Sequence, residues 1–303
     1  MISVVISAYN EEKNIKDCIE SVLDLASEVI VIDNSSTDST SDIAKKLGVK
    51  VFKQQNDVKK IDLQKNFGFE KATGQWILSL DADERLTPQL IKEIKQEVAK
   101  DAKTVGYWIP RKNIIFNKWI RNSIWWPDYQ LRLFKKGKGK FPHATVHIPL
   151  EVKGETRHLS EPMVHESYDS ISLFVNRMNN IYTEVEADEI VKSGKKMSWI
   201  DSVRLPASDF MKTFFLQKGY RDGMHGLVLS ILQAFYMFLV FAKTWEKQGF
   251  YERSDKEVLK GVVKETESIV NQGKFWTLTA LQNETRNPIK KSLYILARKI
   301  YNT

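Results

Sequence analysis

Four apolar runs of strand length in the first 80 residues constrain the fold more than any other feature of this sequence. They cover residues 2–7, 28–33, 49–52 and 76–80. The first, second and fourth are almost continuous in Val, Ile and Leu, which is typical of strands buried on both faces of a parallel sheet. Segments with helical signals separate the runs. This alternation predicts right-handed crossovers and a doubly wound, mostly parallel α/β sheet.

The segments between these runs carry the periodicity and capping signals of helices. Ile15, Ile19 and Val22 fall on one face of a helix. Residues 39–47 form a second, shorter candidate. Thr87 precedes a proline, and this pair suits the cap and the first position of a third helix. We therefore expect these helices to pack on the faces of the sheet.

Ligands of open α/β sheets bind outside the carboxyl ends of the strands, so the residues after each run are candidates for a functional site. The sequence has no glycine-rich loop of the dinucleotide-binding or P-loop type, which disfavours a dehydrogenase or a P-loop nucleotidase. Polar and acidic residues take these places instead. The candidates are Ala8, Tyr9, Asn10 and Glu11 after the first run, Asp33 at the end of the second, and Asp81, Ala82 and Asp83 after the fourth.

Asp81 and Asp83 are two residues apart in an extended segment, so their carboxylates can point the same way. Two neighbouring carboxylates attract a hard divalent cation such as Mg²⁺ or Mn²⁺, which readily shares its oxygen ligands with phosphates. The alternative is an acidic loop that only precedes a helix. At the end of a buried strand we favour a metal that carries a diphosphate, with Asp83 and Asp81 as its ligands.

Two further residues suit a nucleotide. Asp33 ends an otherwise apolar strand, and its carboxylate can accept a hydrogen bond from the N3–H of a uracil ring. The alternative for Asp33 is an Asx turn into the next helix. Lys65 lies on or just before a helix, where its ammonium can neutralise a phosphate. The alternative for Lys65 is an ordinary polar helix face.

Four motifs stand in a fixed order along the first 84 residues. They are S-A-Y-N-E-E at 7–12, V-I-D-N-S-S-T-D-S-T at 31–40, Q-K-N-F-G at 64–68 and L-D-A-D-E at 80–84. In order, spacing and composition they resemble the family 2 glycosyltransferases with the GT-A fold, over about residues 1–135. W-W-P-D-Y-Q-L-R-L-F at 125–134 and H-A-T-V-H at 143–147 are similar to bacterial lipopolysaccharide-core β-1,4-glucosyltransferase-like proteins, and that narrower resemblance runs to about residue 248.

The resemblance implies an inverting, metal-dependent transfer of a hexose from a nucleotide-diphosphate sugar, with UDP-glucose as the expected donor. The acceptor would be a hydroxyl of a lipopolysaccharide-core or other cell-envelope glycan or glycolipid. By the same resemblance, Glu11 and Asp33 hold the nucleoside, and Asp81 and Asp83 lie along the ribose and the metal-bound diphosphate. A polyprenyl-phosphate glycosyltransferase would share this N-terminal half. A non-catalytic nucleotide-sugar-binding scaffold on a membrane is the alternative from another class.

An inverting transfer needs a base within hydrogen-bonding reach of the acceptor hydroxyl. Asp128 is the candidate, because P-D-Y-Q-L-R-L-F resembles the family's acidic residue followed four positions later by an arginine. That arginine, Arg132, would brace the loop or the diphosphate. A turn role for Asp128, or a base supplied by Glu151 or a histidine, are the alternatives.

Aromatic and imidazole side chains gather in the same part of the chain. Trp125 or Trp126 is expected to face the acceptor, since aromatic faces stack on sugars, with core packing as the alternative. His147 or His165 would be an auxiliary ligand of the metal, with polar contacts in a loop as the alternative. A zinc site at His143 and His147 is disfavoured, because Pro142 and Pro149 flank this pair and indicate an extended segment.

The last third of the chain is expected to form a helical, partly apolar extension, at 201–303, after a catalytic domain at 1–200. Residues 205–206 are expected to break the chain. Residues 227–242 carry no charge, and as a helix they would span about 24 Å, less than the roughly 30 Å of a hydrocarbon core. An apolar helix bordered by basic residues suits a membrane interface. A buried helix or a homo-oligomer contact are the alternatives.

The net charge of the chain indicates which kinds of binding partner to expect. The chain has 46 Lys and Arg against 38 Asp and Glu, a net charge of +8, which suits an anionic membrane surface. The basic residues form no stripe with base-reading motifs, so no nucleic-acid partner is expected. The first residues, MISVVISAYN, lack the regions of an export signal, which predicts a cytoplasmic protein on the inner face of the cytoplasmic membrane. A single cysteine excludes an internal disulfide.

Overall fold

The chain divides into two compact units. The computed structural model describes residues 1–57, 60–100, 103–142 and 149–301. Unit 1 comprises Met1–Trp119 and Trp125–Asp169, and unit 2 comprises Ile120–Ile124 and Ser170–Thr303. This division differs from the predicted domain boundary at residue 200, because the helices that begin at Ile171 pack against the later helices of unit 2.

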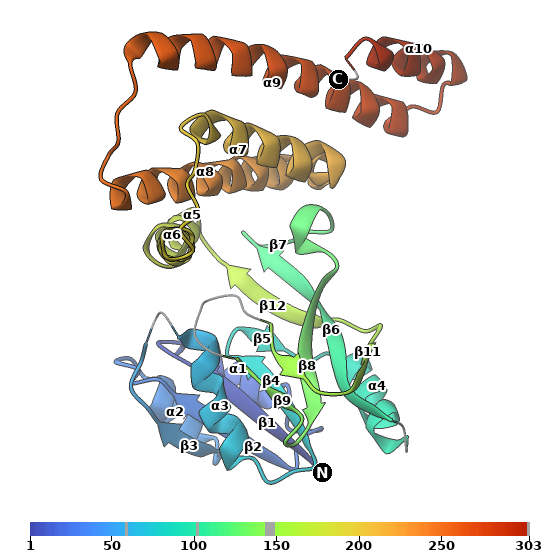
Figure 1. Ribbon diagram of the computed structural model, residues 1–303. Helices are drawn as coiled ribbons and strands as arrows, with labels where there is room; N and C mark the ends of the chain where they lie inside the picture. Colours follow the sequence, from blue (N-terminus) through green and yellow to red (C-terminus); the bar gives the residue numbers. More distant parts are fainter. Residues whose placement is uncertain (58–59, 101–102, 143–148, 302–303) are drawn as a thin grey trace. The chain divides into compact units, whose positions relative to one another are not determined.

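Over the described residues, unit 1 is built on a ten-stranded mixed sheet (Figure 1), whose strands run in the order β3-β2-β1-β4-β8-β6-β12-β5, with β7 and β11 each paired to β6. Strands β1 to β4 are parallel, which confirms the predicted sheet. The sheet continues through β8, which is antiparallel to both β4 and β6. The strands are β1 (Ile2–Ala8), β2 (Glu28–Asp33), β3 (Lys50–Lys53), β4 (Trp76–Asp81), β5 (Glu84–Arg85), β6 (Thr104–Ile115), β7 (Lys118–Trp119), β8 (Asp128–Lys135), β11 (Glu155–His158) and β12 (Met163–Tyr168).

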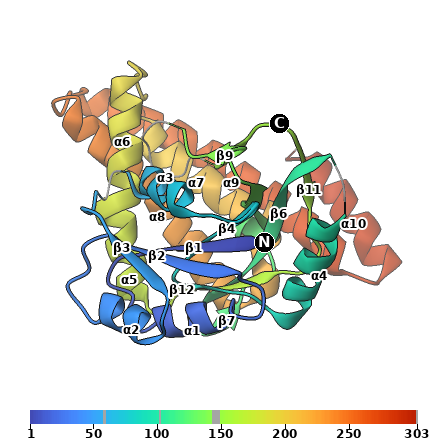
Figure 2. The same ribbon diagram turned by 90° about the horizontal axis from the view of Figure 1, so that it is seen from below.

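Helices cover both faces of the parallel strands, as the alternating pattern predicts. Figure 2 shows α3 on one face and α1 and α2 on the other. Two apolar clusters correspond to these faces: Ile19 and Ile94 belong to one, and Phe69 and Phe134 to the other. The elements of unit 1 outside the sheet are α1 (Ile15–Glu20), α2 (Thr40–Lys46), α3 (Ile61–Lys71), α4 (Pro88–Ala99) and the pair β9 (Gly139–Lys140) and β10 (Glu151–Val152), while η1 (Ser123–Trp125) spans the junction of the units.

Two local sequence signals have clear structural effects. The Thr87 hydroxyl accepts from the Leu90 N–H and caps α4, with the predicted proline at the first helical position. In α3, a Cβ at Gly68 would lie 2.4 Å from Val5 Cγ1 and 2.8 Å from Ile32 Cγ1. The glycine of the Q-K-N-F-G motif therefore lets α3 pack closely on β1 and β2.

Unit 2 is helical, as predicted for the C-terminal region, but Pro206 does not end a helix there. Pro206 lies inside α7, which is packed along α8 and tied to α9 by a two-bond ion pair from Arg204 to Glu265, at 3.0 and 2.9 Å. These contacts compensate for the backbone hydrogen bond of α7 that the proline nitrogen cannot donate. The elements are α5 (Ile171–Arg177), η2 (Met178–Tyr182), α6 (Thr183–Lys192), α7 (Asp201–Phe210), η3 (Met211–Leu216), η4 (Gly219–Asp222), α8 (Met224–Lys247), α9 (Asp255–Glu284) and α10 (Pro288–Lys299).

Helix α8 is longer than the apolar run that signalled it. It has 24 residues, about 36 Å, whereas the uncharged run alone would span about 24 Å, so the length of the helix does not limit it to the membrane surface. By length and composition alone, α8 is the one helix among the described residues that could cross a membrane. The extra length comes from its ends. At the C-terminal end Lys247 pairs with Glu184 and Asp188 of α6, at 2.5 and 3.0 Å.

Candidate functional site

The loops that follow β1 and β2 are bound to each other. The Asn10 N–H donates to Ser36 Oγ at 3.0 Å, and Asn10 Oδ1 accepts from the Thr37 N–H at 2.8 Å. The Glu11 N–H donates to Thr40 Oγ1 at 2.7 Å. Asn10 has a φ of 55°, a left-handed conformation that Asn tolerates better than most residues. This side of the site is therefore held in place before any ligand arrives.

Asp33 is fully buried at the end of β2, and its two oxygens differ. Oδ1 accepts from the Ser36 N–H at 2.9 Å and so forms the turn that was the alternative role for this residue. Oδ2 is also buried, with Lys53 Nζ 3.8 Å away, and makes no hydrogen bond to any described residue. A buried carboxylate oxygen without a hydrogen bond is costly unless a donor completes it. The turn and a ligand can thus use different oxygens.

Asn34, which received no predicted contact with a ligand, is structural. Its side-chain nitrogen donates to Ser7 Oγ at 3.0 Å and to the Ala8 carbonyl at 3.1 Å. Its oxygen accepts from Gln54 Nε2 at 2.7 Å. Asn34 therefore joins β1 and β2 to the loop after β3.

The candidate diphosphate region centres on Asp81, which lies between two buried cations. Lys65 Nζ is 2.7 Å from Asp81 Oδ1, and Arg132 Nη2 is 2.5 Å from Asp81 Oδ2. Burial raises the pKa of Asp81, but Arg132 and Lys65 outweigh burial and hold the pKa far below its ordinary value. Arg132 also donates to the fully buried Glu84 at 2.6 Å. Glu84 in turn accepts from the Asp81 N–H at 2.9 Å.

The two cations keep their charge despite burial. Burial alone would lower the pKa of Lys65, but Asp81 and Asp62 raise it above its ordinary value. Burial likewise opposes the charge of Arg132, and Asp81 and Glu84 reverse that effect, so its pKa is raised. The two cations beside Asp81 therefore stay charged, and the carboxylates of Asp62, Asp81 and Glu84 compensate them.

Asp83, two residues after Asp81, faces a histidine. His165 Nε2, in β12, is 3.5 Å from Asp83 Oδ2, so the structure places one of the two predicted auxiliary histidines beside the predicted metal ligand. The other, His147, lies outside the described residues. Within the described ranges, no three His, Cys, Asp or Glu side chains converge closely enough to hold a metal by themselves.

Asp128 begins β8 and is surrounded by donors. Arg111 Nε is 2.8 Å and Arg111 Nη2 is 2.5 Å from Asp128 Oδ2, which also accepts from Asn113 at 3.2 Å. Asp128 Oδ1 accepts from Gln130 Nε2 at 2.7 Å. Burial raises the pKa of Asp128, but Arg111, together with the hydrogen bonds, lowers it below its ordinary value. The carboxylate therefore stays ionised and fixed in position.

The remaining predicted residues occupy varied surroundings. Trp125 and Trp126 are half-buried, and Trp126 contacts Trp119 edge to face with ring centroids 5.3 Å apart. The Trp125 carbonyl accepts from Asn113 at 2.8 Å. Their predicted role at the acceptor stays a prediction. Ala8 and Ala82 are buried, whereas the side chain of Tyr9 is 44% exposed at the mouth of β1.

Three site residues were missed by the sequence reasoning: Glu84, Arg111 and Asn113. Glu84 was interpreted only as part of an acidic loop before a helix. Arg111 and Asn113 are two residues apart in β6, so they share a face of the strand. Lys112 between them is also polar, so the sequence shows no alternation that would mark this face. The pairing of β6 with β8, which brings Arg111 opposite Asp128, could not be predicted from the sequence either.

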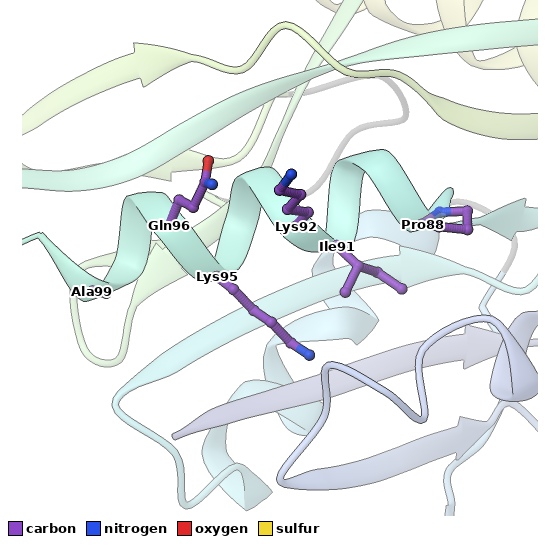
Figure 3. Close-up of a pocket in the computed structure, with 6 residues that line it drawn as sticks. All are labelled: Pro88, Ile91, Lys92, Lys95, Gln96 and Ala99. Carbon is purple, nitrogen blue, oxygen red and sulfur yellow. The ribbon is translucent and has the colours of Figure 1, made fainter.

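A surface hollow on α4 lies apart from this chemistry. Figure 3 shows that its lining comes from this one helix. None of the candidate carboxylates lines the hollow, so we assign it no role in the site. The lining residues are Pro88, Ile91, Lys92, Lys95, Gln96 and Ala99.

Comparisons with known proteins agree with the motifs. The family described as Glycosyl transferase family 2 matches residues 3–150. An uncharacterized glycosyltransferase of Rickettsia typhi is 33% identical over 262 residues, which cover 81% of this chain and 87% of that protein. The lipopolysaccharide core biosynthesis glycosyltransferase LpsC of Rhizobium meliloti is 25% identical, over 83% of this chain and 94% of LpsC. The crystal structure of S. aureus TarS 1-349 in complex with UDP-GlcNAc is similar with a TM-score of 0.44 and 15% identity, covering 84% of this chain and 93% of that fragment.

Glu84→Gln tests whether the missed carboxylate holds the site together. Removing one partner from a buried charge network leaves the other charge undercompensated, so we expect the free energy of unfolding to fall by about 3 kcal/mol. Urea denaturation measures this change. Glu70→Gln, at an exposed position of α3, is the matched control and should stay within about 0.5 kcal/mol of the parent. Equal stability of the two variants would contradict the structural role of Glu84.

Proposed function

Because this chain belongs to glycosyl transferase family 2, we propose that it moves a hexose from a UDP-sugar to a hydroxyl with inversion at the anomeric carbon. The observation that carries this proposal is the buried Asp33 Oδ2, which makes no hydrogen bond to a described residue at the carboxyl edge of the sheet. The N3–H of uracil would supply the missing donor. Glucose is the proposed hexose, on the resemblance of the motifs.

The proposed nucleotide site follows the carboxyl ends of β1, β2 and β4. Tyr9 and Glu11 lie in the fixed loop after β1, beside the turn that Asp33 forms. Asp81 would face the ribose. Lys65 and Arg132, whose charges persist despite burial, would approach the diphosphate. The mutual ion pairs of these three residues keep their side chains ordered before the donor binds.

Asp83 and His165 fit a divalent cation. A neutral imidazole nitrogen and a carboxylate oxygen, 3.5 Å apart, are both electron-pair donors and are brought together favourably by a cation between them. We therefore propose Asp83 and His165 as protein ligands of Mg²⁺ or Mn²⁺, while Asp81 keeps its ion pairs with Lys65 and Arg132. Such an ion would neutralise charge that develops on the leaving diphosphate.

Asp128 is the proposed base of the transfer. Its Oδ2 is taken by Arg111 and Asn113, whereas Oδ1 has a second lone pair beyond the bond from Gln130. The acceptor hydroxyl would donate to Oδ1. As its oxygen attacks the anomeric carbon, the bond to the diphosphate oxygen breaks and the hydroxyl proton passes to Asp128. Trp125 or Trp126 would stack on the acceptor sugar.

The proposed acceptor is a lipopolysaccharide-core or related cell-envelope glycan. The 25% identity with LpsC over most of both chains supports this choice. A polyprenyl phosphate is the competing acceptor. A non-catalytic sugar-nucleotide-binding role is the alternative from another class, and a transfer assay separates it from catalysis.

Donor binding is the direct test of the proposed function. We expect calorimetry with UDP-glucose, UDP-GlcNAc and GDP-mannose to show binding of one UDP-sugar that requires Mn²⁺ or Mg²⁺ and is lost with EDTA. Asp83→Ala should weaken that binding by at least about tenfold, because it removes a metal ligand. Asp24→Ala, at an exposed position, is the control. Unchanged affinity of Asp83→Ala would refute the metal assignment, and no binding of any donor would refute the function.

The pKa of Asp128 gives a prediction about pH. Arg111 helps to lower this pKa, so the parent should retain the ionised base at acidic pH. In Arg111→Met, burial still raises the pKa of Asp128, but the arginine that mainly lowers it is gone. The acid limb of kcat for transfer should therefore move to higher pH. Asp128→Asn should keep donor affinity and lose transfer. Arg157→Met, an exposed arginine of β11, should leave the profile in place. An unmoved limb in Arg111→Met would assign the base to another residue.

We further propose that the protein is cytoplasmic and binds the anionic inner face of the cytoplasmic membrane through unit 2. Helix α10 exposes an apolar stripe, formed by Ile289, Leu293, Leu296 and Ile300, with exposed Lys290, Lys291 and Lys299 beside it. This combination suits an interfacial helix on acidic lipid. The ion pairs between α8 and α6 favour a peripheral role for α8 over a spanning one.

Vesicle binding tests the membrane proposal. The full chain should sediment with vesicles that contain phosphatidylglycerol, less at high salt, and not with pure phosphatidylcholine. Replacing Leu293 and Leu296 together by Glu should lower the partition coefficient by at least about tenfold, because apolar area is removed and charge is reversed. Leu23→Glu, an exposed leucine of unit 1, is the control. A chain that self-associates but never binds acidic vesicles would make the α10 stripe an oligomer contact.

A further inference from the structure

Asn113 is a buried amide that joins the two halves of the site. It lies in β6 and is 1% exposed. Its side-chain nitrogen donates to the Trp125 carbonyl at 2.8 Å and to Asp128 Oδ2 at 3.2 Å. Its oxygen lies 2.6 Å from Nδ1 of His165, its partner across the β6–β12 ladder. One amide therefore contacts both the proposed base and a proposed metal ligand.

The neighbours of Asn113 fix the direction in which its amide faces. The Trp125 carbonyl and the Asp128 carboxylate can only accept hydrogen bonds, so they require the NH₂ group. The reversed amide would set its oxygen against both acceptors, at a large electrostatic cost. With the observed orientation, the Asn113 oxygen can only accept, and the proton between it and His165 must belong to Nδ1.

The position of that proton decides what His165 can bind. A neutral imidazole protonated at Nδ1 has its lone pair on Nε2, the atom 3.5 Å from Asp83 Oδ2. Without Asn113, the ring could place its proton on Nε2 and donate it to Asp83, which would leave no lone pair for a cation. The hydrogen bond on one side of the ring thus determines the ligand on the other side.

We propose that Asn113 is a positioning residue that fixes the tautomer of His165 and the location of Asp128 at the same time. It thereby aligns the end of the site that holds the leaving diphosphate with the end that activates the acceptor. This inference rests on the proposed function for its catalytic consequence. Its effect on His165 depends on the geometry of the chain alone.

The tautomer is measured by ¹⁵N NMR of the histidine rings in the full chain, without donor or metal, at pH 8, where an ordinary histidine is neutral. His165→Gln assigns the signal. We expect the parent to show the proton on Nδ1 and Asn113→Leu to show it on Nε2. Asn113→Asp should keep the proton on Nδ1, because its carboxylate still accepts from His165. The same tautomer in the parent and in Asn113→Leu, or a proton on Nε2 in the parent, would overturn the proposal.

The same variants separate the two tasks of Asn113. Titration of Mn²⁺ in the presence of UDP, read by the signal of free Mn²⁺, should show about tenfold weaker metal binding in Asn113→Leu and near-parental binding in Asn113→Asp. Transfer should fall about a hundredfold in both, since Asp128 loses the hydrogen bond from Asn113 in each and is held less precisely. If Asn113→Leu is poorly folded, Asn113→Asp alone still tests the proposal, because it should keep metal binding and lose transfer. Parental transfer in Asn113→Asp would contradict the link between Asn113 and Asp128. If no sugar nucleotide binds to the parent, the proposed function fails while the tautomer result stands.

Discussion

The buried ion pairs of Arg132 are the interaction on which the rest of the site depends. Its guanidinium joins Asp81 at the end of β4 to Glu84 at the start of β5, and Lys65 of α3 closes the group from the other side. Charges this deeply buried persist only when each has a partner. The helix, the two strands and the loop between them are therefore held in one arrangement by electrostatics, in addition to the apolar packing of the sheet.

That arrangement brings together the two groups of residues that we propose for the two tasks of the transfer. The parallel strands β1, β2 and β4 carry the residues proposed for the nucleotide, and the antiparallel strands β6 and β8 carry those proposed for the acceptor. Glu84 and Arg111 lie 3.7 Å apart where the two groups meet. A ligand on one side is thus in electrostatic contact with residues of the other.

Much of the first half of the chain could be predicted, because its evidence is local. Continuous apolar runs fix β1, β2 and β4, and their ends locate Asp33 and Asp81. The narrower motifs pointed to Asp128 and Arg132. Partnerships between distant strands could not be predicted, since the register of β6 against β8 and β12 is set by packing. The length of α8 was underestimated because a helix can continue through charged residues that find ion-pair partners on a neighbouring helix.

The glycine of α3 links the packing of the sheet to the chemistry of the site. Gly68 lets α3 lie directly on Val5 and Ile32, and Lys65 sits one turn earlier on the same helix. The position of the Lys65 ammonium relative to Asp81 therefore depends on how closely α3 packs on β1 and β2. Evolution cannot adjust the two separately: a bulkier residue at this contact would lift the cation away from its partner. A change in the packing of this core would consequently shift the ion pair between Lys65 and Asp81 as well.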